Sequence, residues 1–66
     1  MHPWLLYDKA MLQSLINMKL RDYYDSLKKM CDDLEIDYDE LLRVLHKHHL
    51  VYVPDLNQLR DDGVTS

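Results

Sequence analysis

The sequence predicts a mainly α fold of three helices with a helix-turn-helix-like core, followed by a short β-hairpin or extended return strand. A chain of 66 residues has room for one domain. Its only glycine is Gly63, and its two prolines, Pro3 and Pro54, lie near the two ends. The residues between the prolines are therefore free to be helical. Apolar residues recur there at intervals of three and four, which is the spacing of one helix face.

The first helix is predicted from about Lys9 to Tyr24. Its inward stripe follows the i, i+3, i+4, i+7 pattern and contains Leu12, Leu15, Ile16, Lys19, Leu20 and Tyr23. Met11 and Met18 widen the stripe, and we interpret both as core-filling residues, because methionine adapts to irregular gaps. A stripe this wide predicts a helix that packs against two neighbours, or against one neighbour and a partner chain.

The second and third helices are each expected to begin at a capping residue. Ser26 is the predicted N-cap of the second helix and Asp37 that of the third, since their side-chain oxygens can accept a backbone N–H of the first turn. Ile36, in the turn between them, is expected to point inward. The predicted inward faces contain Leu27, Met30, Cys31 and Leu34 in the second helix, and Leu41, Leu42 and Leu45 in the third, with Val44 at the edge.

The residue types change after His49, from those typical of helices to those typical of strands and turns. Residues 50–53, Leu-Val-Tyr-Val, are β-branched and aromatic, Pro54-Asp55 is typical of a turn, and residues 57–60 are expected to return as a strand. We therefore predict a single helical domain over residues 1–60 and a disordered tail over residues 61–66.

Composition restricts the classes of protein. The chain has 12 acidic residues against 8 lysines and arginines, a formal net charge of −4, which works against binding to phosphates. A single cysteine excludes an internal disulfide and suits a reducing compartment. No secretory signal and no run of membrane-spanning length is seen, so we expect a cytoplasmic protein that does not enter membranes. A homodimer stays open, because small domains often gain burial by association.

The helix-turn-helix spacing leaves two functional readings open. A recognition helix reads bases with residues near its N-terminus, and that end of the third helix carries Asp37, Tyr38, Asp39 and Glu40. These carboxylates would be repelled by phosphates, so we favour the use of this core to bind a protein. The alternative is a dimeric helix-turn-helix DNA-binding regulator.

The chain offers little for catalysis or metal binding. His46, His48 and His49 lie close in sequence, yet no acidic residue shares their turn and Cys31 has no CxxC partner. Cys31 is expected on an inward face, where a thiol behaves as a small apolar group. We therefore expect no catalytic residues, no metal and no cofactor, and a protein that is not an enzyme.

The segment Trp4-Leu5-Leu6-Tyr7 precedes the first helix and has two interpretations. It either folds over the core, as a small domain needs, or stays exposed as an aromatic anchor for a partner. In the second case Tyr23, Tyr24 and Tyr38 can extend the same patch. The candidate interaction residues are therefore Trp4, Leu5, Tyr7, Tyr24, Asp37, Tyr38, Asp39 and Glu40.

Several short motifs are similar to a known family. They are residues 15–22 (Leu-Ile-Asn-Met-Lys-Leu-Arg-Asp), Ser26-Leu27, Met30-Cys31, Ile36-Asp37, the leucines of the third helix, Tyr52 and Asn57-Gln58. From Met11 to Leu59 the sequence resembles a small bacterial family, domain of unknown function 4250. The resemblance implies a compact, mostly helical bacterial or phage protein and no particular activity.

Two positions depart from the family pattern. Members usually carry glycine and then Tyr or Phe after the third helix, where this chain has His49-Leu50, and an aromatic residue usually follows Asn-Gln, where this chain has Leu59. The Trp-Leu-Leu-Tyr segment lies outside the resemblance.

These observations lead to one expectation about function. We expect a small acidic, non-catalytic interaction module, of phage or mobile-element type, that regulates or inhibits a larger protein. If that partner binds nucleic acid, the carboxylates of Asp32, Asp33, Asp37, Asp39 and Glu40 can imitate phosphates.

Overall fold

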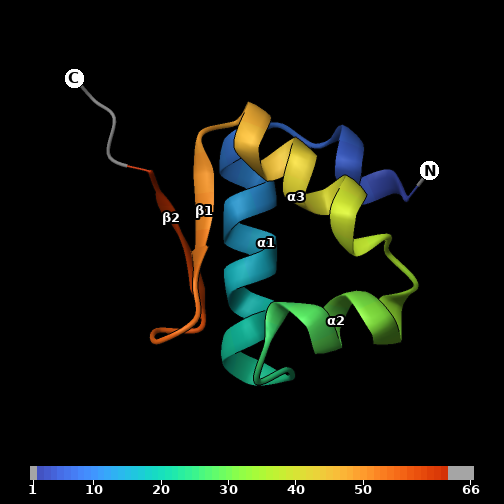
Figure 1. The fold of residues 1–66 in the computed structure, drawn as a ribbon, viewed down its shortest axis with the longest axis vertical. Helices are drawn as coiled ribbons and strands as arrows, with labels where there is room; N and C mark the ends of the chain where they lie inside the picture. Colours follow the sequence, from blue (N-terminus) through green and yellow to red (C-terminus); the bar gives the residue numbers. More distant parts are fainter. Residues whose placement is uncertain (1, 63–66) are drawn as a thin grey trace.

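The computed structural model describes residues 2–62 and confirms three helices followed by an antiparallel hairpin (Figure 1). The elements are the 3-10 helix η1 (Pro3–Leu6), helices α1 (Lys9–Asp22), α2 (Leu27–Leu34) and α3 (Tyr38–Lys47), and strands β1 (Leu50–Val53) and β2 (Gln58–Asp61). In Figure 1 the hairpin lies on one side of α1, and α2 and α3 lie on the other. Strand β2 packs against α1.

Each α-helix begins at a side-chain cap. The carboxylates of Asp8 and Asp37 accept the backbone N–H groups of Met11 and Glu40 at 2.8 and 3.0 Å, and the Ser26 hydroxyl accepts that of Lys29 at 3.1 Å. The predicted caps Ser26 and Asp37 are therefore confirmed. Helix α1 ends at Asp22, two residues before the predicted end.

Within residues 2–62, three residues other than glycine have positive φ, and each one ends or reverses an element. Glu35 (φ 59°) is the C-cap of α2, His49 (φ 60°) follows α3, and Asn57 (φ 50°) closes the hairpin turn. At Glu35 the reversal lets the Ile36 N–H reach the Cys31 carbonyl at 2.9 Å, as in a left-handed helix cap. His49 stands where the family pattern has glycine, and its left-handed backbone is the physical reason that glycine suits this position.

The hairpin extends further along the chain than predicted. Strand β2 covers residues 58–61 instead of 57–60, and Asp61 pairs with Leu50. The Lys9 ammonium contacts the Asp61 carboxylate at 2.5 Å, and the Asp62 N–H donates to the His49 carbonyl at 3.0 Å. The predicted boundary after residue 60 is therefore wrong for Asp61 and Asp62, and residues 63–66 of the predicted tail lie outside the described residues.

One apolar core joins all of the elements. Its buried residues are Leu5, Leu12, Ile16, Leu20, Leu27, Met30, Cys31, Ile36, Leu41, Leu45, Leu50 and Leu59. Every apolar position predicted inward in α2 is buried or half-buried.

The predicted core was too wide at four positions. Met11, Met18, Tyr23 and Leu42 are exposed by 53%, 37%, 69% and 37%. The buried stripe of α1 is the narrow line Leu12, Ile16 and Leu20. Because the neighbouring elements pack around that line, Met11 and Met18, seven residues apart, project from the opposite side of the helix.

Candidate functional site

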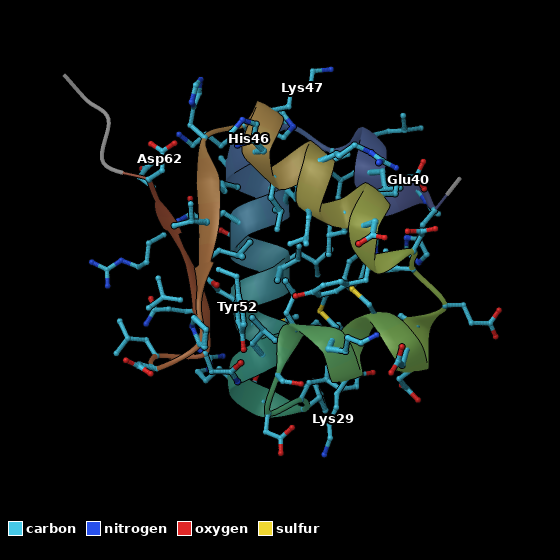
Figure 2. All side chains as sticks on the ribbon, viewed as in Figure 1. Lys29, Glu40, His46, Lys47, Tyr52 and Asp62 are labelled. Atoms are coloured by element: carbon cyan, nitrogen blue, oxygen red, sulfur yellow. The ribbon has the colours of Figure 1, made fainter. Side chains whose placement is uncertain are left out.

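The first candidates for a site are the polar residues of the family motifs, and one of these is Asn57. Its side-chain amide donates to the carbonyls of Leu20 and Tyr24 at 3.1 and 2.9 Å, where α1 ends. Its Oδ1 accepts the Tyr52 hydroxyl proton at 2.7 Å, and the Leu27 N–H donates to that same hydroxyl oxygen at 3.3 Å. Figure 2 shows Tyr52 where the hairpin meets the end of α1 and the start of α2.

Asn17 binds strand β2, two residues beyond Asn57, in a comparable way. Its Oδ1 accepts the Leu59 N–H at 2.6 Å and its Nδ2 donates to the Leu59 carbonyl at 3.1 Å. The side chain therefore pairs with β2 much as a neighbouring strand would. Gln13 adds a longer contact, 3.4 Å, to the same carbonyl.

We call Asn17, Tyr52 and Asn57 the hairpin clamp. All three lie in the motifs on which the family resemblance rests. Their polar atoms form hydrogen bonds that hold the hairpin against α1 and α2. Among the described residues, every buried side-chain nitrogen and oxygen has a hydrogen-bond partner. The clamp is therefore a structural hydrogen-bond network. Its polar side chains are of types that also occur in catalytic sites, but here they stabilise the fold.

The predicted N-terminal anchor mostly covers the core. Leu5 is buried at 7% exposure, and Trp4 and Tyr7 are half-buried against the core. The exposed apolar residue of this segment is Leu6, at 76%, which the sequence did not single out. The first of the two interpretations therefore describes Trp4, Leu5 and Tyr7, and they do not form an open aromatic patch.

The other two predicted aromatic residues each contact a charged neighbour. The Tyr24 hydroxyl donates to the Asp33 carboxylate at 2.5 Å, and this hydrogen bond raises the pKa of Tyr24. The Lys28 ammonium lies 5.4 Å from the centre of the Tyr38 ring, within cation–π range. Tyr24 and Tyr38 are half-buried beside the core, so each offers a partner only part of its ring.

The predicted acidic residues Asp32, Asp33, Asp37, Asp39 and Glu40 lie in one stretch of the chain, from the end of α2 to the first turn of α3. Residues 32–40 contain six acidic residues and no lysine or arginine. We call these six the acidic edge: Asp32, Asp33, Glu35, Asp37, Asp39 and Glu40. All are exposed except Glu40, which is half-buried. Asp37 also caps α3, which fixes the position of its carboxylate.

The opposite end of α3 carries the basic residues His46 and Lys47 instead. Glu40 lies at the start of the helix and His46 and Lys47 at its end (Figure 2). His49 has left the helix, and its Nδ1 lies 3.7 Å from the Asp62 carboxylate. Within residues 2–62, no group of three or more His, Cys, Asp or Glu side chains is placed to hold a metal ion.

Cys31 has the environment predicted for it. The side chain lies on the inward face of α2 and is fully buried in the core. Burial raises the pKa of the thiol to about 11. Since the thiolate is the nucleophilic form, this cysteine is a poor nucleophile at neutral pH.

The comparisons with known proteins identify a family. A family model described as Domain of unknown function (DUF4250) matches residues 7–59. The chain belongs to this family. The match contains the whole hairpin clamp, and it begins at Tyr7, four residues before the start of the resemblance seen in the sequence. No curated protein and no solved structure gives a significant match to the chain. None of the helices described is long and apolar enough to cross a membrane.

Proposed function

We propose that this DUF4250 protein is a small, non-catalytic interaction module that regulates or inhibits a larger protein, and that the acidic edge is its binding surface. The observation that carries the proposal is the run of six exposed or half-exposed carboxylates over residues 32–40, a stretch without lysine or arginine, although Lys29 lines the same hollow as Asp32 and Asp33. A cytoplasmic protein encoded by a phage or mobile element suits this size and charge.

The chemistry of the acidic edge favours a basic partner. Its side chains come from the end of α2, the α2–α3 connection and the first turn of α3. The caps of α2 and α3 hold these elements in place, so the carboxylates approach a partner with little loss of backbone entropy. Complementary charge chiefly accelerates association and selects the partner. If that partner binds nucleic acid, the carboxylates compete with phosphates for the same cations.

The polar groups outside the acidic edge support a non-catalytic role. The hairpin clamp is fully engaged in structural hydrogen bonds, and Cys31 is buried with a raised pKa. A catalytic site needs a nucleophile or an acid and base in reach of a substrate. The three clamp side chains and Cys31 supply neither.

A competing function is favoured by the connection between α2 and α3. Only three residues, 35–37, separate the helices, and a hairpin follows α3, as in DNA-binding proteins with a wing beside their recognition helix. The end of α3 offers His46 and Lys47, but its first turn carries Asp39 and Glu40. An electrophoretic shift assay with duplex DNA at low and moderate salt separates the two functions. Salt-sensitive binding would favour the DNA regulator.

The direct test is affinity capture followed by binding measurements with the purified partner. We expect Asp39→Asn to weaken binding about two- to fivefold, as for one charge at the rim of an interface. The matched control is Asp55→Asn, which removes the same charge from the exposed hairpin turn. Equal weakening by both variants would show that net charge, rather than the acidic edge, determines the affinity.

A further inference from the structure

Helix α3 presents one face to solvent, and the charge of that face changes sign along the helix. Asp39, Leu42, Arg43 and His46 follow the i, i+3, i+4, i+7 spacing of a single face, and Lys47 borders it. All five residues are exposed. Asp39 lies in the acidic first turn, whereas His46 and Lys47 lie in the last turn, at the opposite end of the helix (Figure 2). We call these five residues the outer face of α3.

The charges of the outer face have no partner within residues 2–62. Asp39 and Arg43 are four residues apart, a spacing that allows an ion pair on a helix, yet no ion pair joins them. The ion pairs in this part of the chain are Lys9–Asp61, Arg21–Asp22, Lys29–Asp25 and His49–Asp62, and no hydrogen bond or ring contact engages the charged side chains of the outer face. These charges therefore stay available to another molecule.

A second copy of this chain matches the outer face, because the charge pattern is its own complement when it is reversed. In an antiparallel pair of α3 helices, the acidic first turn of each helix lies beside the basic last turn of the other. Asp39 of each copy then comes within reach of Arg43 of the other. The two helix dipoles run in opposite directions, which also favours this pairing. A parallel pair would instead bring like charges together.

Leu42 supplies an apolar centre for the pair. Its side chain is 37% exposed, whereas Leu41 and Leu45 of the same helix are at most 1% exposed. Because Leu42 lies near the middle of α3, a two-fold axis through the middle of the helix brings Leu42 of one copy against Leu42 of the other. Burial of these side chains favours association, and the charges select the antiparallel direction.

The contact is small. Helix α3 has 10 residues, which corresponds to a length of about 15 Å. Small interfaces are typical of transient complexes, so we expect copies that associate reversibly at micromolar to millimolar concentration.

We propose that α3 is a self-association surface, through which two copies of this chain pair antiparallel. The pair covers Asp39 and the rest of the first turn of α3, which belong to the acidic edge. Self-association therefore competes with the basic partner, and the acidic edge opens to that partner when the chain is dilute. This competition, but not the self-association, rests on the proposed function.

NMR diffusion measurements and amide spectra of the full chain, recorded from micromolar to millimolar concentration, test the self-association. We expect a monomer that becomes a dimer, with shifts in the amides of residues 39–47. A chain that stays monomeric at millimolar concentration would overturn the proposal. Shifts confined to the neighbourhood of Met11 and Met18 would also overturn it, because they would assign the contact to the exposed side of α1.

Two charge-reversal variants test the antiparallel arrangement. Asp39→Lys and Arg43→Glu each bring like charges together in their own dimers, so each variant alone should associate about tenfold more weakly or worse. In an equimolar mixture both contacts again join opposite charges, and association should return to about the wild-type level. The matched controls, Asp55→Lys and Arg60→Glu, reverse exposed charges of the hairpin and should leave association unchanged.

The mixture gives the decisive result. Circular dichroism checks that each variant folds, and recovery in the mixture confirms that both variants are competent to associate. A mixture that associates as weakly as the separate variants, or controls that weaken association equally, would refute the antiparallel pair.

A capped hexalysine peptide tests the competition. When the peptide is added to the associated wild-type chain, we expect the monomer fraction to rise, whereas a capped hexaglutamine peptide should not change it. Dimers that persist while hexalysine shifts the amides of residues 32–40 would refute the competition and leave the self-association intact. Hexalysine that fails to shift those amides and releases no monomer would count against the acidic edge as the surface for a basic partner, again without affecting the self-association.

Discussion

Replacing Asn57 tests the account of the hairpin clamp most directly. The side chain makes three hydrogen bonds. They link the hairpin to the C-terminal end of α1 and, through Tyr52, to α2. At about 1 kcal/mol each they contribute about 3 kcal/mol to the free energy of unfolding. A chain of this length has roughly 3–10 kcal/mol in total. The loss of one side chain should therefore remove a large part of the stability.

The backbone of Asn57 adds a second, separable contribution. Its φ of 50° suits asparagine and glycine and costs alanine about 1 kcal/mol. We expect Asn57→Gly to lose about 3 kcal/mol and Asn57→Ala about 4 kcal/mol. This order reverses that of ordinary helix and strand positions, where glycine is the more destabilising residue.

Urea unfolding followed by circular dichroism measures both variants. If the alanine variant is already unfolded in water, a titration with trimethylamine N-oxide recovers its stability, because this osmolyte favours burial. Gln58→Ala is the control, because Gln58 is half-buried, as Asn57 is, and lies outside the hairpin clamp. This substitution should change the free energy of unfolding by less than about 0.5 kcal/mol. An alanine variant as stable as the glycine variant, or a loss below about 1 kcal/mol for both, would refute the reasoning.

Three further predictions follow from individual residues. Asn17→Ala should cost about 2 kcal/mol and speed hydrogen exchange at the Leu59 amide, since it removes two hydrogen bonds to that residue; unchanged exchange would contradict the pairing. Glu35→Gly should raise stability by about 1 kcal/mol in thermal unfolding, because Glu35 is an exposed residue at φ 59°; destabilisation would indicate an interaction of the carboxylate. Cys31 should react with a thiol reagent at pH 8 only after unfolding. Because its folded pKa is raised to about 11, its stabilising effect is complete below the unfolded pKa and is lost as pH rises toward 11, which urea titrations at pH 8 and 10 should detect.

The helices could be predicted from the sequence because their signals are local. Spacing at three and four residues placed Leu12, Ile16 and Leu20 inward, and the caps Ser26 and Asp37 lie within three residues of the amides they bind. The same spacing cannot tell how wide the buried stripe is. That width depends on where the neighbouring elements pack, so Met11 and Met18 were wrongly placed in the core.

The hairpin clamp could not be predicted, because it joins residues far apart in the chain. Asn17 and Leu59 are 42 positions apart, and Asn57 and Leu20 are 37 apart. Nothing in the composition distinguishes an asparagine that binds a distant backbone from one that faces solvent. The family motifs carried the available signal, since they contain Asn17, Tyr52 and Asn57. The acidic edge, in contrast, lies in one stretch of sequence, and all of its residues but Glu35 were named from the sequence; its role as a binding surface stays a prediction.

The pairing of Asn17 with Leu59 also bears on whether the edge of the hairpin can pair with other chains. An open strand edge offers unpaired N–H and C=O groups to other chains and is a common start of aggregation. In β2 the outward groups of Leu59 are already occupied by the Asn17 amide. A helix side chain thus occupies the Leu59 position on the edge of a sheet that has two strands within residues 2–62.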